Sequence, residues 1–219
     1  MRDFLAFLAN LNGRHEDDAQ LPSLKALSQL LGQSVPRVRE HLAVARALGL
    51  VEAKPRVGLR RLPYSFRPAA SLSLHYALCR ARRYFAQFAD LRKRIEAAYF
   101  VEAVHALTPE DKQELQDLLA RAWEKLRGNP IHIPHEEHRR LHLTIFRRLD
   151  NVFVRGLLEA YWDAYEAVGL NLYTDYQYLH KVWEYHQRIV DGICSGDVED
   201  AHQALVEHTE LIRYQPDVA

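Results

Sequence analysis

Four histidines have a spacing suited to binding a metal ion. His138 and His142 lie four residues apart, which places two imidazoles on one face of an α-helix. His186 and His208 follow in two later segments, each with its own apolar repeat. Imidazole nitrogens are good ligands of Zn, Ni, Cu and Fe and poor ligands of Mg and Ca. If three helices pack together, the four rings can meet at one divalent transition metal.

The segments that must position these histidines are predicted to be helices. Thr108 and Pro109 form a helix start, with Thr at the cap and Pro at the first helical position. No strand pattern interrupts this part of the sequence, so we expect an all-α antiparallel bundle. Apolar residues recur at intervals of three and four over residues 72–88, 90–106, 108–127, 134–149, 151–170, 175–194 and 197–212.

Composition predicts a soluble, cytoplasmic protein with no membrane partner. A chain of 219 residues with 48% hydrophobic content has ample material for one large domain or two small ones. Cys79 and Cys194 lie far apart, which argues against a disulfide framework or a thiolate zinc site. The sequence shows neither a signal-peptide pattern nor an apolar run long enough to span a bilayer.

The net charge of zero conceals a strongly basic segment. Residues 21–67 hold nine Lys and Arg residues against two acidic ones, a balance of +7, whereas residues 1–20 carry −2 and residues 68–219 carry −5. A compact basic unit joined to a mildly acidic one is typical of a nucleic-acid-binding domain with a separate partner domain. The alternative is a solvated basic face.

Turn and cap residues predict helices near the start of the chain. Residues 3–11 form a short apolar helix. Ser23 is placed to cap a second helix that Gly32 ends. Ser34 is placed to cap a third helix, with a proline tolerated in its first turn, and Gly49 stops it.

Two strand-like runs, 50–54 and 59–62, follow these helices. Helix, turn, helix and β-hairpin is the order of a winged helix-turn-helix. Prolines and small polar residues at 62–71 then interrupt the helical periodicity. We therefore predict a mainly α fold with two domains: a winged helix-turn-helix over 1–66, and a helical effector- and metal-binding domain over 67–219.

The basic segment carries an ordered motif made of Leu21-Pro22-Ser23, Leu27, Leu30 or Leu31, Gly32, Ser34, Val38-Arg39-Glu40, Leu42, Gly49-Leu50-Val51, Arg56 and Gly58. In this order the residues resemble the winged helix-turn-helix of GntR-type bacterial repressors. One departure is Val35-Pro36-Arg37 where the family usually has Arg-Thr-Pro, so Arg37 is expected to replace a missing arginine.

This resemblance predicts how the domain contacts double-stranded DNA. Arg37 and Arg39 stand near the start of the recognition helix, where arginine can pair with guanine in the major groove. The other basic side chains are expected to hold phosphates and to position the wing. The remaining residues assigned to DNA binding are Ser34, Arg46, Lys54, Arg56, Gly58, Arg60 and Arg61.

The helical part, over residues 80–212, resembles the FCD ligand-binding domain of the FadR branch of the GntR family. Its metal-binding members carry Asp-x-x-x-His on one helix and one histidine on each of two later helices. Here His138 stands at the Asp position, and the other ligands implied are His142, His186 and His208. Zn is the expected metal, with Ni or Fe as alternatives, and His135 is a substitute ligand.

An all-histidine site leaves the charge of the metal uncompensated, which favours an anionic effector. Arg92 and Glu96 match an Arg-x-x-hydrophobic-Glu pattern, and in the family this arginine can bind the effector carboxylate. Arg92 is therefore the predicted effector-binding residue. The alternatives are a surface i,i+4 ion pair between these two residues and, for the histidines, a polar pocket without metal.

Together these features predict a transcriptional regulator, a repressor that binds operator DNA as a homodimer. A small carboxylate effector at the metal and at Arg92 is expected to change the affinity for DNA. One alternative is a regulator that senses the metal ion itself. A more remote one is a helical-bundle metalloenzyme, but the sequence lacks a general base such as the Glu of His-Glu-x-x-His, so we predict that the chain is not an enzyme.

Replacing the predicted base-reading arginine should weaken DNA binding. In Arg39→Ala, the loss of a bidentate contact to guanine should cost about 1–3 kcal/mol of binding free energy and relax the preference at one base pair. Fluorescence anisotropy with a labelled operator measures this loss. Unchanged affinity would contradict the docking of the recognition helix.

Overall fold

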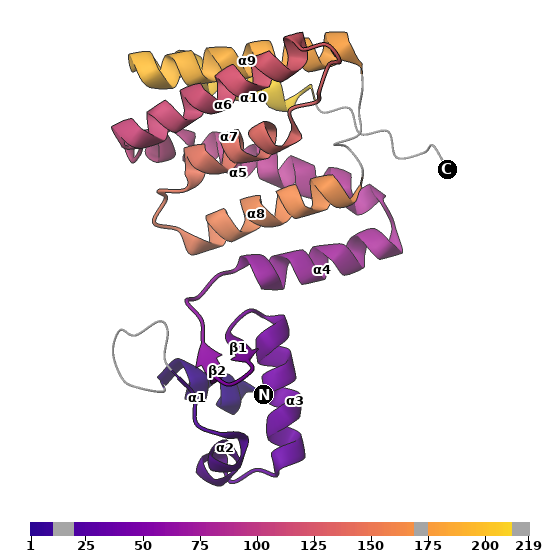
Figure 1. The fold of residues 1–219 in the computed structure, drawn as a ribbon, viewed down its shortest axis with the longest axis vertical. Coiled ribbons are helices and arrows are strands. Elements are labelled where there is room, and N and C mark those ends of the chain that lie inside the picture. The colour runs from indigo at the N-terminus through magenta and orange to yellow at the C-terminus, as the bar shows by residue number, and fades with distance from the viewer. Residues whose placement is uncertain (11–19, 169–174, 212–219) are drawn as a thin grey trace.

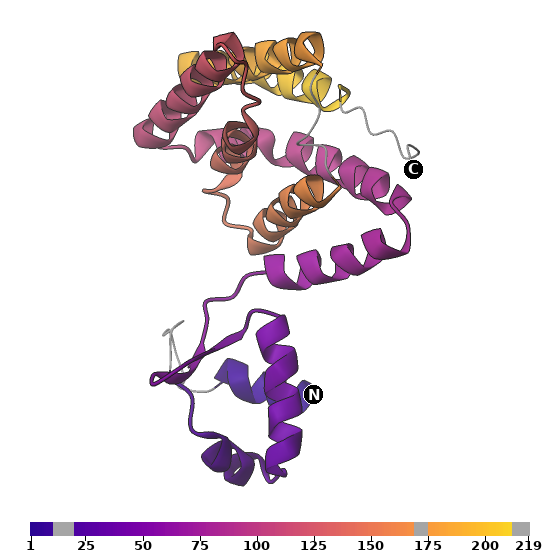
Figure 2. The same ribbon diagram turned by 45° about the vertical axis from the view of Figure 1, so that its right-hand side comes forward.

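A computed structural model describes residues 1–10, 20–168 and 175–211 of the chain. In this part the protein is mainly α-helical, with one two-stranded antiparallel sheet. Figures 1 and 2 show the sheet and the first three helices gathered at one end of the molecule and the later helices at the other, with α4 between them. The predicted fold class is confirmed.

The first part of the chain has the order of a winged helix. Ser23 caps α2 through a bond from the amide of Ala26 to its hydroxyl oxygen, and Gly32 ends α2 in the left-handed region with a φ of 61°. Ser34 precedes α3 without a side-chain cap. The elements are α1 (Arg2–Asn10), α2 (Leu24–Leu31), α3 (Val35–Ala47), β1 (Val51–Lys54) and β2 (Gly58–Arg61).

A small apolar core holds these elements together. Phe4 of α1, Leu27 of α2 and Val38 of α3 are fully buried in it. The strands pair with Val51 opposite Arg61. The guanidinium of Arg61 also reaches the carbonyls of Leu8 and Ala9, both at 3.4 Å, so it fastens α1 to the sheet.

The second part of the chain is a bundle of helices around a larger core. The best-packed pairs are α9 with α10, α4 with α8, and α6 with α7. None of the described helices combines the length and the apolar character that crossing a bilayer requires. The helices are α4 (Arg67–Arg80), α5 (Arg83–His105), α6 (Pro109–Arg127), α7 (His135–Phe146), α8 (Val152–Ala167), α9 (Tyr176–Ser195) and α10 (Val198–Thr209).

The first helix of this part differs from the prediction of one helix over 72–88. The helix α4 begins earlier, at Arg67, inside the stretch predicted to interrupt helical periodicity. Pro68 stands in its first turn, where the missing N–H has no helical partner. The chain then breaks at Ala81, which is extended with φ −165° and ψ 126°. The predicted ends at residues 170 and 212 lie outside the described residues.

Asp111 joins the start of α6 to the end of α7. Its carboxylate accepts the amide of Thr108 at 2.9 Å, and the hydroxyl of Thr108 accepts the amide of Asp111 at 3.3 Å, which forms a capping box. The same buried carboxylate accepts Arg148 Nε at 2.8 Å and a hydrogen bond from Arg147. The bond from Arg148, with the others, holds the pKa of Asp111 well below its usual value.

Replacing this carboxylate should destabilise the bundle. Asp111→Asn loses the charge that two arginines and a helix start share, and should lower the free energy of unfolding by about 2–4 kcal/mol at pH 7. Because the native pKa is depressed, this stabilisation is present above the unfolded pKa and is lost as the pH falls through the native one. Urea unfolding measures both effects.

A matched control is available on the same helix. Asp117 is exposed, and its side chain accepts a single hydrogen bond, from Gln113, within residues 1–10, 20–168 and 175–211. Asp117→Asn should therefore stay within about 0.5 kcal/mol of the wild type. Equal stability of the two variants would show that the capping box and its ion pairs do not stabilise the fold.

Candidate functional site

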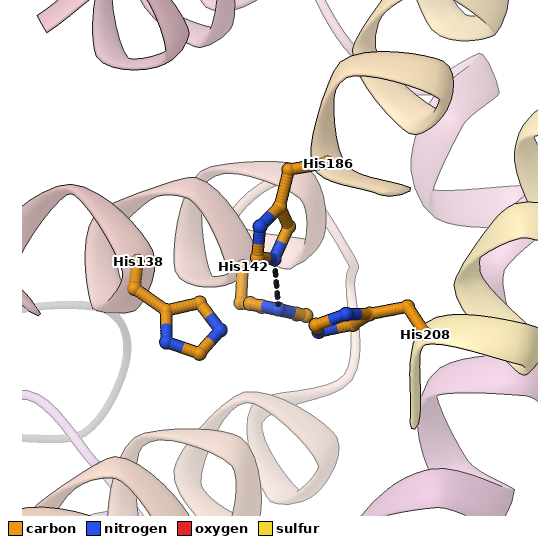
Figure 3. Close-up of side chains that lie close together, drawn as sticks. All are labelled: His138, His142, His186 and His208. Carbon is orange, nitrogen blue, oxygen red and sulfur yellow. Dashed lines mark hydrogen bonds between the residues drawn. The ribbon is translucent and has the colours of Figure 1, made fainter. Parts of the chain in front are cut away.

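The four predicted ligands converge on one point inside the bundle. His138 and His142 project from α7, His186 from α9 and His208 from α10. One ligand-capable atom of each residue lies within 4.8 Å of those of the others, and Figure 3 shows the rings turned toward one another. His142, His186 and His208 are buried. His135 is not part of this group among the described residues.

Local sequence features bring α9 and α10 close enough for this convergence. Gly196 ends α9 with a φ of 89°, and Asp197 caps α10 directly afterwards. A Cβ at Gly192 of α9 would lie 2.8 Å from the Cβ of Ala201 in α10, so only glycine permits this approach. As a result the ring centroids of His186 and His208 are 4.3 Å apart.

The nitrogen separations fit one shared metal ion after a small contraction. The Nε2 atoms of His142 and His186 are 3.2 Å apart. Metal–nitrogen bonds of about 2.0–2.1 Å place ligand nitrogens about 2.9 Å apart at adjacent octahedral positions and about 3.4 Å apart at tetrahedral ones. The widest separation, 4.8 Å, exceeds the span of about 4.2 Å between opposite octahedral ligands. Small rotations of the rings are needed to close that gap.

The protonation states of the rings also suit a metal. Burial lowers the pKa of all four imidazoles, because the charged form loses its hydration and faces neighbouring positive charge. The rings are therefore neutral and keep a lone pair each. Within the described residues no hydrogen-bond partner meets His138 Nε2, His186 Nδ1 or either nitrogen of His208. Unsatisfied buried polar atoms cost about 1–3 kcal/mol each, and a metal ion would satisfy them.

Arg92 and Glu96 of α5 lie beside the histidines. They form an i,i+4 ion pair at 2.8 Å, as one of the two alternatives predicted. The pair is buried and not at the surface, because Arg92 is 3% exposed and Glu96 0%. Burial opposes both charges, yet their mutual attraction keeps the pKa of Glu96 below and that of Arg92 above its usual value. The guanidinium also lies over the ring of Tyr161, 4.7 Å from its centroid.

His142 is shared between this ion pair and the histidine cluster. Its Nδ1 is 2.9 Å from Arg92 Nη2 and 3.4 Å from an oxygen of Glu96. Guanidinium groups only donate, so Nδ1 accepts from Arg92 when the ring proton is on Nε2. When the proton is on Nδ1, Glu96 accepts it, and the lone pair is on Nε2, which lies 3.4 Å from Arg92 Nη2 and 3.2 Å from His186 Nε2. Ligation through Nε2 requires this second tautomer.

A small cavity of about 40 Å³ adjoins the site. Since one water occupies roughly 10–15 Å³ on this measure, the cavity has room for only a few atoms. Trp162 of α8 packs over His138 and His142, with centroid distances of 4.7 and 5.2 Å. The sequence could not distinguish this pocket aromatic from those of the core, because both have the same helical spacing. Residues lining the cavity include Arg92, His135, His138, Tyr161, Tyr165 and Trp183.

The residues predicted to contact DNA lie in the winged part. Arg37 and Arg39 are exposed in the first half of α3, and Arg46 is exposed near its end. Lys54 and Gly58 flank the hairpin turn, and Arg56 stands between them with a φ of 65°. Ser34 is exposed, whereas Arg60 and Arg61 are half-buried. Arg61 holds α1, as described above, a role that the sequence did not reveal.

A winged helix joined to a helical bundle is an architecture typical of transcriptional regulators that bind DNA. Residues 87–211 match the model of the FCD domain family, and the chain belongs to that family. A sequence relative is the HTH-type transcriptional regulator LutR of Bacillus subtilis (strain 168). It is 23% identical over 202 residues, which cover 90% of this chain and 91% of LutR.

Solved structures show the same fold over nearly the whole chain. Streptococcus agalactiae GntR has a TM-score of 0.67 at 17% identity, covering 96% of this chain and 94% of that one. E. coli McbR/YncC has a TM-score of 0.51 at 20% identity, covering 95% and 91%. The chain is therefore a transcriptional regulator of the GntR type with an FCD domain. These relatives agree, indirectly, with the prediction that it is not an enzyme.

Removing one histidine of the cluster should abolish tight metal binding. In His186→Ala the affinity for Zn²⁺ should fall by more than the roughly 10–100-fold that loss of a residue supporting a ligand causes. The control is His180→Ala on the same helix, because His180 is 41% exposed and outside the cluster. Competition titration with a chelating dye measures both affinities. Equal affinities would place the metal elsewhere.

Proposed function

We propose that the chain is a repressor whose affinity for operator DNA is controlled by a small carboxylate effector at a metal held by four histidines. The observation that carries this proposal is the convergence of neutral, buried imidazoles beside the buried guanidinium of Arg92. Zn is the expected metal, and Ni or Fe would suit the same ligands. The ligands are His138, His142, His186 and His208.

When bound, the divalent ion supplies positive charge that attracts an anion and orients it. The chain supplies the remaining recognition. With the proton of His142 on Nδ1, Glu96 accepts it and Arg92 loses its acceptor at 2.9 Å; the other ring nitrogen, Nε2, lies 3.4 Å from the same Arg92 Nη2 and would be taken by the metal. The guanidinium can then donate two parallel hydrogen bonds to a carboxylate. Glu96 keeps the guanidinium in place through the ion pair at 2.8 Å.

The closed shape of the site supports a regulatory role. A cavity of about 40 Å³ is far smaller than the roughly 300–1,000 Å³ of a typical ligand pocket. A carboxylate larger than a few atoms must therefore displace the surrounding aromatic side chains when it binds. Binding that changes the packing of α7, α8 and α9 favours one arrangement of the bundle over another, which is what control of a distant site requires.

The DNA-binding part of the proposal rests on the exposed arginines of α3 and of the wing. Arg37 and Arg39 are assigned to base edges, and Arg46, Lys54 and Arg56 to phosphates. A homodimer would place two recognition helices in successive major grooves, about 34–36 Å apart. A change in the bundle that alters this spacing would then alter the affinity for the operator.

One observation favours the second candidate, a sensor of the metal ion itself. Four protein ligands beside a cavity of only about 40 Å³ resemble a closed metal site more than one with an open position for an effector. In that case metal loading alone would change operator binding, without a carboxylate. The relatives are transcriptional regulators, so a metalloenzyme is not proposed.

The experiment uses a DNA duplex that the wild-type protein selects from a random library. The affinity of Zn²⁺-loaded protein for this duplex is measured with acetate, lactate, pyruvate, succinate or gluconate. At least one carboxylate should shift the wild-type affinity by about 5-fold or more. Arg92→Lys keeps the charge but loses the planar pair of donors, so it should bind the duplex and lose the shift.

The control is Arg94→Lys on the same helix, since Arg94 is exposed and pairs only with Asp90 among the ion pairs of the described residues. It should respond as the wild type does. A response that persists in Arg92→Lys contradicts the assigned effector contact. A shift produced by Zn²⁺ and reversed by chelation, with no added effect of any carboxylate, would favour the metal sensor.

A further inference from the structure

A single carboxylate, that of Asp163 in α8, holds side chains from two other helices. Arg67, the first residue of α4, donates to it twice: its Nε and Nη2 atoms each lie 2.9 Å from one of the two oxygens. The hydroxyl of Ser71, also in α4, donates at 2.9 Å. Arg139 of α7 donates from Nη2 at 2.9 Å. We call this group, Arg67, Ser71, Arg139 and Asp163, the Asp163 clamp.

The Asp163 clamp is only partly open to water. The side chains of Arg139 and Asp163 are 21% and 27% exposed, and that of Arg67 is more open at 44%. Burial of the carboxyl opposes its ionisation, but the hydrogen bonds from the arginines and Ser71 keep the pKa of Asp163 below its usual value. A bidentate arginine in such a network is stronger than an isolated surface ion pair.

One side of the Asp163 clamp adjoins the histidine cluster. Arg139 directly follows His138 on α7, and Asp163 directly follows Trp162 on α8. The ring of Trp162 packs over His138 and His142. Rotation or translation of α7 or α8 that accommodates a ligand among the histidines must therefore move the residues that hold Asp163.

The other side of the clamp adjoins the DNA-binding part. A Cβ at Gly156 of α8 would lie 2.7 Å from the amide nitrogen of Arg67, so α8 lies against the start of α4. A Cβ at Gly49, the residue that stops the recognition helix, would lie 2.5 Å from Pro68 Cγ. Residues 66–68 thus contact α8 on one side and the winged helix on the other.

We propose that Asp163 is the positioning residue that couples the histidine cluster to the winged helix, because its carboxylate links Arg139 of α7 to Arg67 of α4. This inference rests on the proposed function, since it names the connection through which the site acts. The coupling needs both arginines. Arg139 moves with α7, and its bond to Asp163 links that movement to Arg67 at the start of α4. The next residue of α4, Pro68, lies against Gly49 of the winged helix. Loss of either contact should leave the histidine cluster and the winged helix folded, but a change at one should no longer affect the other.

The test measures hydrogen–deuterium exchange of the full chain with and without Zn²⁺. In the wild type, Zn²⁺ should slow exchange in α7, α9 and α10 and also change it in α4, which contains no histidine of the cluster. Asp163→Asn should keep the response of α7, α9 and α10 and lose that of α4. Arg139→Gln should have the same effect, although Arg139 makes no ion pair with α4 among the described residues.

Two variants separate coupling from a merely structural role. Glu166→Gln removes the second ion pair of Arg139, at 2.9 Å, but leaves the Asp163 clamp intact, so the α4 response should remain. Asp163→Glu retains the charge and should restore part of the response. All variants are compared at equal Zn²⁺ occupancy and after confirming cooperative thermal unfolding, so that loss of folding is not mistaken for loss of coupling.

Operator binding is measured in parallel with the selected duplex. In the wild type, Zn²⁺ alone or with one of the five carboxylates should shift the affinity for the duplex by about 5-fold or more. In Asp163→Asn this shift should fall below about 2-fold. If α4 responds in the wild type through Asp163 while operator affinity does not change, the proposed regulation fails and the coupling stands. If α4 does not respond in the wild type, or responds equally in Asp163→Asn, the inference about Asp163 is overturned.

Discussion

The structure depends on a buried ion pair that shares an imidazole with a cluster of neutral histidines. Arg92 and Glu96 are both almost completely buried, and His142 contacts each of them. Removing one member of such a pair leaves an uncompensated charge and typically costs about 3–5 kcal/mol. Burying the histidine rings among aromatic side chains has a separate cost, because several ring nitrogens lack a hydrogen-bond partner among the described residues. The buried polar atoms without a hydrogen-bond partner at the centre of the bundle support the proposal that a ligand binds there.

In the proposed regulation, the same arrangement connects the histidine cluster inside the bundle to the start of α4. The helix that carries His138 and His142 also carries Arg139, and the helix that supplies Trp162 also supplies Asp163. On each of these two helices, one residue belongs to the histidine cluster or contacts it, and the next residue belongs to the Asp163 clamp at the start of α4. Packed interfaces tend to adopt discrete arrangements, so a ligand that repacks the aromatic walls is expected to move α4 by a defined step.

Local features of the fold were predictable from the sequence, and tertiary ones were not. Ser23, Gly32 and Thr108 act on the backbone within a few residues, so they mark helix ends in any context. The histidine cluster is the exception: the spacing of His138 and His142, together with the resemblance to the FCD domain, predicted its four members. By contrast, no glycine or proline marks the break at Ala81, and the burial of Arg92 depends on what packs against it. The link from Arg139 through Asp163 to Arg67 joins residues far apart in the chain, and periodicity carries no signal of it.

The central claim is that one metal ion is held by the four histidines. Crystals of the protein grown with Zn²⁺, with diffraction data collected on both sides of the zinc absorption edge, test it directly. We expect a single strong anomalous peak within the bundle, about 2.0–2.1 Å from ring nitrogens of His138, His142, His186 and His208. A peak bound by other residues, or no peak between these four rings, would contradict it.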